Sequence, residues 1–360
     1  MNRFNIYFRK DGRFEGRIYS TDQQTHVRSY HSFFGHSRED VEHKMCEFRA
    51  KNATVPSVNF SFSDLYLSWK QAMAHRIKES TAANYEMKAV KHLLPAFGSL
   101  SVADITSEHI YDFISEKQQS GLSNRYISDI LVMLKSVFKF GAQQFHWQNP
   151  MYGVSMPKKH KAEVQLLTAD EQQRLERYIA ENHNLTTLGI ALAKSTGLRI
   201  GELCALQWAD IDLEKRTITV RKTIQRIQSK NGSRRTKVII TDPKSESSCR
   251  VIPIPAFMIA FLREFRGNGE DFVISGTDKP VEPRVMQYRF TKILKNGNLP
   301  SVHFHSLRHI FASTCIKLGF DVKALSEILG HSSVEITLNR YVHSSFEQKI
   351  EYMNRLKSAV

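Results

Sequence analysis

A stretch near the C-terminal end of the chain contains two histidines and an arginine and reads His305-Ser306-Leu307-Arg308-His309. Leu329-Gly330-His331 follows it, and then comes Tyr341. Well upstream stands Thr196-Gly197-Leu198-Arg199-Ile200-Gly201-Glu202-Leu203. The order is therefore R-x-G-E, then H-x-L-R-H, then L-G-H and a tyrosine. No other motif in the chain competes with this set.

These residue types suit the cleavage of a phosphodiester by a protein nucleophile. Such a reaction needs an attacking hydroxyl, a base, cations for the phosphoryl oxygens and an acid for the departing sugar oxygen. A phenol has an ordinary pKa near 10, so its proton must be removed in place. The planar fork of an arginine can bind two non-bridging phosphate oxygens, which suits Arg199 and Arg308 as twin clamps.

The set resembles the active site of the tyrosine recombinases. That resemblance implies that Tyr341 attacks DNA to form a 3′-phosphotyrosyl link, and that no cofactor is needed. It also implies a role for each of the other matching residues. Arg199 and Arg308 hold the scissile phosphate, His305 is a base and phosphate contact, His331 is a second phosphate contact, and Glu202 orients an arginine or histidine.

A lysine completes the resemblance. Lys244, in Pro243-Lys244-Ser245, is similar to the hairpin lysine that protonates the leaving 5′ oxygen in this family. Lys237 and Lys230 lie near it on a similar hairpin and remain alternatives for the general acid.

The charge of the chain favours a polyanionic partner. The 51 Lys and Arg residues exceed the 36 Asp and Glu residues, which gives a net charge of +15 and a pI near 9.6. Between Lys215 and Arg250, eleven basic residues face two acidic ones. Nucleic acid or an acidic membrane surface would fit this balance.

The cysteines and histidines give little support for a metal or a disulfide framework. The four cysteines are far apart and form no CxxC pair, which favours a reducing cytoplasm. His303, His305 and His309 could supply three nitrogens to zinc, but no carboxylate or cysteine accompanies them at helical spacing. No apolar run approaches the roughly 18 residues of a membrane span, so no membrane partner is expected.

The first 55 residues predict a small separate domain. Alternating apolar residues indicate strands before and after an Asp11-Gly12 turn, and a third strand over residues 25–33. Ser37 and Asp40 then form a variant capping box for a helix. Three strands and one helix resemble the arm-site DNA-binding domain of some mobile-element integrases.

The rest of the chain predicts two further domains. Residues 57–155 have helical periodicity with room for roughly four helices, and resemble the core-binding domain of the same family. Residues 163–360 predict a mixed α/β catalytic domain with a β-rich insert and a C-terminal tail. The expected fold is therefore multidomain, mainly α with small β parts.

The resemblance implies a site-specific DNA recombinase that integrates and excises a mobile element, such as a prophage or conjugative transposon. Its partners would be double-stranded DNA with core and arm-type sites, and three further copies in a homotetramer that passes through a Holliday junction. An excision factor and a host DNA-bending protein are left open as partners. The alternatives are a housekeeping chromosome-dimer recombinase, a type IB topoisomerase and a DNA-binding regulator without catalysis.

Overall fold

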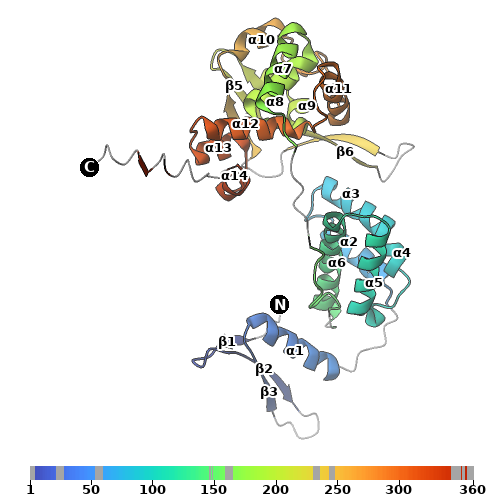
Figure 1. Ribbon diagram of the computed structural model, residues 1–360. Helices are drawn as coiled ribbons and strands as arrows, with labels where there is room; N and C mark the ends of the chain where they lie inside the picture. The colour runs from blue at the N-terminus through green and yellow to red at the C-terminus, as the bar shows by residue number, and fades with distance from the viewer. Residues whose placement is uncertain are drawn as a thin grey trace. The chain divides into compact units, whose positions relative to one another are not determined.

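The computed structural model describes residues 5–21, 28–52, 60–145, 147, 149–158, 165–229, 236–242, 248–341, 350, 353 and 354. The chain divides into two compact units, Met1–Lys161 and Ala162–Val360 (Figure 1). Each unit is built mainly from helices, with small antiparallel sheets. The expected mainly α, multidomain fold is confirmed.

The first unit begins with a three-stranded antiparallel sheet in the order β1-β2-β3, made of β1 (Ile6–Phe8), β2 (Phe14–Thr21) and β3 (Arg28–Gly35). Helix α1 (Arg38–Asn52) packs on one face of this sheet, with Ile18, Val41 and Met45 buried between them. The backbone N–H of Asp40 donates to Ser37 Oγ at 3.1 Å, which confirms the predicted helix start. The third strand extends beyond its predicted end because Phe14 pairs with Gly35.

The second part of this unit is a helical block with one core. Aromatic and aliphatic side chains at helical spacing, among them Phe62, Trp69, Ile130 and Phe138, are buried together. A π-helical turn over Ala89–Leu93 precedes Pro95, which has no backbone N–H to donate. The helices are α2 (Phe62–Met73), α3 (Glu79–Lys88), α4 (Leu94–Phe97), α5 (Ser107–Gln119) and α6 (Asn124–Phe145).

The second unit places its helices around two small sheets. Strands β4 (Ile211–Asp212), β5 (Thr217–Val220) and β8 (Arg250–Pro253) form an antiparallel sheet in the order β4-β5-β8. Strands β6 (Thr223–Gln228) and β7 (Thr236–Thr241) form a separate hairpin. The helices are α7 (Ala169–Glu181), α8 (Leu185–Thr196), α9 (Ile200–Ala205), α10 (Met258–Glu264), α11 (Pro283–Asn296), α12 (His305–Lys317), α13 (Val322–Leu329) and α14 (Val334–Tyr341).

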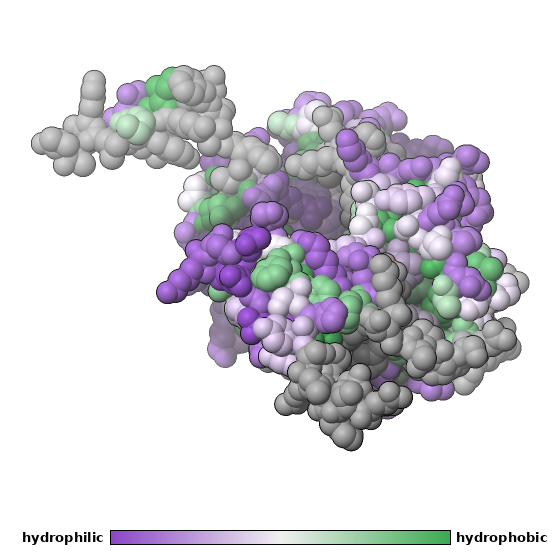
Figure 2. All heavy atoms as spheres, turned by 90° about the horizontal axis from the view of Figure 1, so that it is seen from below, coloured by the Kyte–Doolittle hydropathy of each residue, from purple (hydrophilic) through white to green (hydrophobic). Residues whose placement is uncertain are grey.

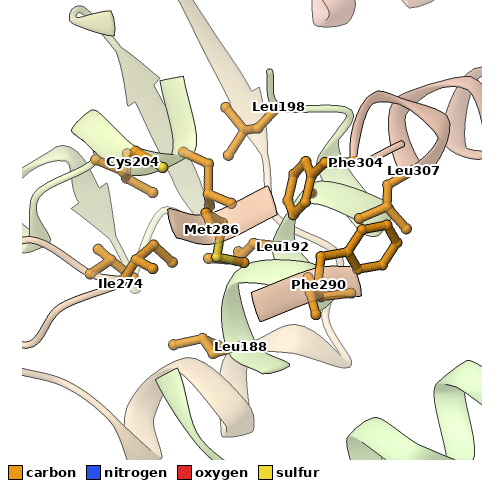
Figure 3. Close-up of a cluster of buried hydrophobic side chains, with 14 of the residues drawn as sticks. Leu188, Leu192, Leu198, Cys204, Ile274, Met286, Phe290, Phe304 and Leu307 are labelled. Atoms are coloured by element: carbon orange, nitrogen blue, oxygen red, sulfur yellow. The ribbon is translucent and has the colours of Figure 1, made fainter. Parts of the chain in front are cut away.

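The core of the second unit holds α8, α11 and α12 together. Figure 3 shows side chains of these helices pointing into one cluster, with Leu192, Phe290 and Leu307 among them. Most residues of helix α8 are buried, which is typical of a helix surrounded by others. The C-terminal end of α8 and the N-terminal end of α12 are thereby fixed close to each other.

The surface outside these cores is mixed in character. On the face shown in Figure 2, hydrophilic residues alternate with small apolar patches. Among the helices of the described residues, none combines the length and the apolar content that a bilayer crossing requires.

Helix α8 ends at a glycine that has no room for a side chain. Gly197 is in the left-handed region with φ of 68°, and a Cβ built there would lie 2.6 Å from Phe311 Cδ1 and 2.9 Å from Leu329 Cδ2. Glycine adopts this conformation without the steric cost that other residues incur. Gly197 therefore allows α12 and α13 to approach the turn that carries Arg199.

We expect Gly197→Ala to lower the free energy of unfolding by about 2 to 5 kcal/mol, because left-handed strain and overpacking add. Denaturant unfolding of the full chain measures this loss. Gly319→Ala is the matched control, since Gly319 is also left-handed but has no neighbouring atom within 4 Å of the added Cβ. Equal losses for the two variants would show that crowding at Gly197 is unimportant.

Candidate active site

The two motif arginines bind backbone carbonyls that lie far away in the sequence. Arg199 Nη2 donates to the carbonyl of Gly330 at 2.9 Å. Arg308 donates to the carbonyls of Gly197 and Leu329, at 2.8 and 2.7 Å. These bonds join the R-x-G-E, H-x-L-R-H and L-G-H segments into one site, as the sequence pattern requires.

The two arginines differ in their access to solvent. The side chain of Arg199 is 34% exposed, whereas Arg308 is only 2% exposed as a residue. Desolvation, followed by repulsion from Arg199, lowers the pKa of Arg308 to about 9. Arg308 is therefore still charged at neutral pH, and Arg199 is the more accessible of the two.

A buried carboxylate balances part of this positive charge. Glu202 accepts hydrogen bonds from Arg199 Nη1 at 2.6 Å and from Arg250 Nη2 at 2.9 Å. Burial by itself would raise the pKa of Glu202, but the hydrogen bonds and charge of Arg250 and the charge of Arg199 outweigh it and lower the pKa. Glu202 therefore lies beside Arg199, one of the two motif arginines.

Arg250 is a component of the site that the motifs did not reveal. It opens strand β8, its side chain is 6% exposed, and its Nε donates to the carbonyl of Ile328 at 2.6 Å. Arg250 therefore links the sheet to both Glu202 and the end of α13. The available signal was a basic residue at the start of the apolar run Val251-Ile252, where a buried arginine needs a carboxylate partner.

Three histidines of the site lie on helix α12 and in the turn between α13 and α14. The rings of His305 and His309 lie perpendicular with their centroids 4.8 Å apart. His331 forms a hydrogen bond through Nδ1 to Thr337 Oγ1 at 2.8 Å. Desolvation and then neighbouring arginines lower the pKa of His309 and of His331 to about 4. His305 is exposed as a residue, and its pKa is lowered by desolvation of part of its ring, by His309 and by Arg308.

Tyr341, the last described residue of α14, lies beside His309 and His331. Its hydroxyl is 2.9 Å from Nδ1 of His309, and its ring stacks on His331 with the centroids 6.5 Å apart. The ring also packs against the buried cluster that contains Leu325 and Leu329. Desolvation raises the pKa of the phenol, while the charges of Arg308, Arg340 and Arg199 oppose that shift.

Lys244 lies outside the described residues, as does Lys230. Lys237 is described, on strand β7. The assignment of the general acid therefore stays a prediction. Strands β7 and β8 are the described elements on either side of Lys244.

The described part of the site is suited to an anionic ligand. Four arginines, at positions 199, 250, 308 and 340, contribute to the charge around the histidines and Tyr341, and Glu202 is the acidic residue that binds two of them. Within the described ranges, no group of three or more His, Cys, Asp or Glu residues is placed to hold a metal ion. Phosphate is the ligand that this arrangement of arginines matches best.

Comparison with known proteins bears directly on this site. The profile of the phage integrase family matches residues 160–348, which is more than half of the chain. The chain belongs to the phage integrase family. Residues 61–118 also match the N-terminal SAM-like domain of phage integrases.

Two curated relatives match most of the length of this chain. The tyrosine recombinase XerC-like protein of Caldanaerobacter subterraneus subsp. tengcongensis is 28% identical, over 90% of this chain and 91% of that protein. The ICEBs1 integrase of Bacillus subtilis is 24% identical over 74% of each chain. Family membership confirms the predicted tyrosine-type site-specific DNA recombinase.

Solved integrase structures share the fold. The Tn1549 transposon integrase in complex with a circular intermediate DNA superposes with a TM-score of 0.69 and 22% identity, over 82% of this chain and 99% of that one. A lambda integrase dimer bound to a core site gives a TM-score of 0.59 and 21% identity, over 94% of each chain. Both likenesses confirm the architecture of this phage integrase family member.

We expect Glu202→Gln to destabilise the chain by about 3 to 5 kcal/mol at neutral pH, because Arg250 loses its buried carboxylate. The folded-state pKa of Glu202 is lowered, so its contribution is full above the ordinary value of 4.5 and is lost as pH falls through the folded-state pKa. Denaturant unfolding of the wild type and of Glu202→Gln between neutral and acidic pH measures this contribution to stability.

The difference between wild type and Glu202→Gln should be constant above pH 4.5 and shrink below it. Glu214→Gln is the matched control, because Glu214 is exposed in the same unit. A difference that persists unchanged in acid would contradict the role of the Glu202 charge.

Proposed function

We propose that this phage integrase family member integrates and excises a mobile DNA element through a 3′-phosphotyrosine intermediate formed on Tyr341. The observation that carries the proposal is the convergence of Tyr341, Arg199 and Arg308 on one cationic site. The three residues come from separate segments of the chain, and each forms a hydrogen bond with a residue of another motif segment: Arg199 with Gly330, Arg308 with Gly197 and Leu329, and Tyr341 with His309.

The proposed roles follow the resemblance of the site to that of the tyrosine recombinases. Arg199 and Arg308 bind the non-bridging oxygens of the scissile phosphate and stabilise the charge that develops there. His305 and His331 contact the same phosphate. Glu202 holds the guanidinium of Arg199 in place, and Lys244 protonates the leaving 5′ oxygen. The phosphotyrosyl link keeps the energy of the broken bond, so no nucleotide cofactor is required for religation.

The N-terminal sheet supports a role in a mobile element. The face of the sheet opposite α1 carries the exposed aromatic rings of Tyr19 and Tyr30, which pair across the strands. Arg17 lies over the rings of Tyr7 and Tyr30, at 5.5 and 5.1 Å from their centroids. Glu15, almost fully buried, accepts from Arg17 at 2.7 Å and orients it. We propose that this face binds arm-type DNA.

The proposed assembly is a tetramer on two DNA sites. One similar solved structure is a lambda integrase tetramer bound to a Holliday junction. Four copies would let two pairs of strands be exchanged in turn. An excision factor and a host DNA-bending protein are the proposed accessory partners.

A housekeeping recombinase is the second candidate function. The XerC-like relative aligns along nearly the whole chain, which favours it. Arm-type binding by the N-terminal sheet would favour the mobile-element function instead. Relaxation of supercoiled DNA without recombination would indicate a topoisomerase, and tight binding without a covalent adduct would indicate a regulator.

We expect the wild type, and not Tyr341→Phe, to form a detergent-resistant covalent adduct with nicked duplexes taken from candidate element ends. The phenylalanine keeps the ring that stacks on His331 but lacks the nucleophilic oxygen. Gel electrophoresis of labelled DNA detects the adduct, and peptide mass locates it on the chain. Tyr288→Phe is the control, because Tyr288 is an exposed tyrosine of the same unit. An adduct that persists in Tyr341→Phe would contradict the assignment of the nucleophile.

We expect Arg17→Ala to weaken binding of arm-type DNA by about 1 to 3 kcal/mol if the guanidinium contacts a base, and to reduce the salt slope by about 1 if it contacts a phosphate. Fluorescence anisotropy at several salt concentrations measures both quantities. Arg38→Ala, on the exposed first turn of α1, is the matched control. Equal effects of the two variants would argue that only bulk charge acts here.

A further inference from the structure

The hydroxyl of Tyr341 already has a partner in the structure. Nδ1 of His309 lies 2.9 Å from the phenolic oxygen. His331 stacks on the ring of the tyrosine and uses its own Nδ1 for Thr337. Among the described hydrogen bonds of this site, the bond to the nucleophile is therefore made by His309, and neither of the histidines that the family resemblance singled out makes it.

The position of His309 is fixed by the fold. The residue is 5% exposed, within α12, and the preceding Arg308 anchors that helix to Gly197 and Leu329. The ring of His305 lies against it on its own helix, and Arg340 approaches from α14. Little reorganisation is needed to keep the imidazole on the tyrosine hydroxyl.

The imidazole of His309 is unprotonated at neutral pH in the absence of DNA. Desolvation, followed by the charges of Arg340 and Arg308, lowers the pKa of His309 to about 4, so the ring is neutral at pH 7. A neutral imidazole has one ring nitrogen with a free lone pair. A separation of 2.9 Å lies within the reach of a general base. A bound phosphodiester would add a negative charge and so favour the protonated ring.

We propose that His309 is the catalytic base of strand cleavage. Its Nδ1 accepts the phenolic proton as the oxygen of Tyr341 forms a bond to phosphorus. The bond from phosphorus to the 5′ oxygen breaks, and that oxygen takes a proton from the general acid, for which Lys244 is the candidate. Religation reverses each transfer, and the proton returns from Nδ1 to the phenol. This inference rests on the phosphotyrosyl chemistry proposed above.

The test compares single-turnover adduct formation by wild type, His309→Ala and His309→Asn on a nicked duplex. An asparagine amide can occupy the place of Nδ1 and keep the hydrogen bond, but it cannot take a proton at neutral pH. Both variants should therefore cleave about 100- to 10,000-fold more slowly than wild type. A fluorinated tyrosine at position 341, which has a more acidic phenol, should recover part of the loss in both variants.

His183→Asn is the control, since this exposed histidine pairs with Glu264 in the same unit. Melting temperature and DNA affinity check that each variant is folded. Cleavage by His309→Asn at the wild-type rate would reduce His309 to a hydrogen-bond partner and overturn the proposal. Faster cleavage by His309→Ala would overturn it too, since the bond would then restrain the tyrosine. Absence of an adduct in the wild type would instead contradict the proposed function itself.

Discussion

The bridge from Glu202 to Arg199 and Arg250 is the interaction on which the rest of the catalytic unit depends. A carboxylate that is 4% exposed must be compensated, and two guanidinium groups from different segments do so. Arg199 in turn holds the carbonyl of Gly330, and Arg250 holds that of Ile328. One buried charge thereby determines how the R-x-G-E turn, the small sheet and the end of α13 meet.

The ends of helices α8 and α13 form part of the site. Gly197 and Gly330 are left-handed residues that close α8 and α13, and the carbonyls near these ends would lack helical partners. Arg308 and Arg199 provide those partners. The arginines that are proposed to bind phosphate thus also complete the helices, so the same guanidinium groups contribute to both stability and function.

The family and the start of a helix could be predicted from the sequence, because short local motifs encode them. The order of the arginine, histidine and tyrosine motifs indicated the family, and Ser37 and Asp40 start α1 as predicted. The Arg250–Glu202 pair spans 48 residues, and the contact of His309 with Tyr341 requires α14 to fold back on α12. No spacing rule links such residues, because only the packing of distant helices brings them together.

The way in which Arg199 and Arg308 are held affects how the DNA target of the protein can change. Their partners in the protein are backbone carbonyls and the carboxylate of Glu202, and their proposed partners in DNA are phosphate oxygens, which are the same at every base pair. With these proposed contacts, the two arginines do not distinguish one DNA base sequence from another. If the N-terminal sheet binds DNA as proposed, substitutions on its exposed face can change the target while the chemistry of the catalytic unit is inherited unaltered.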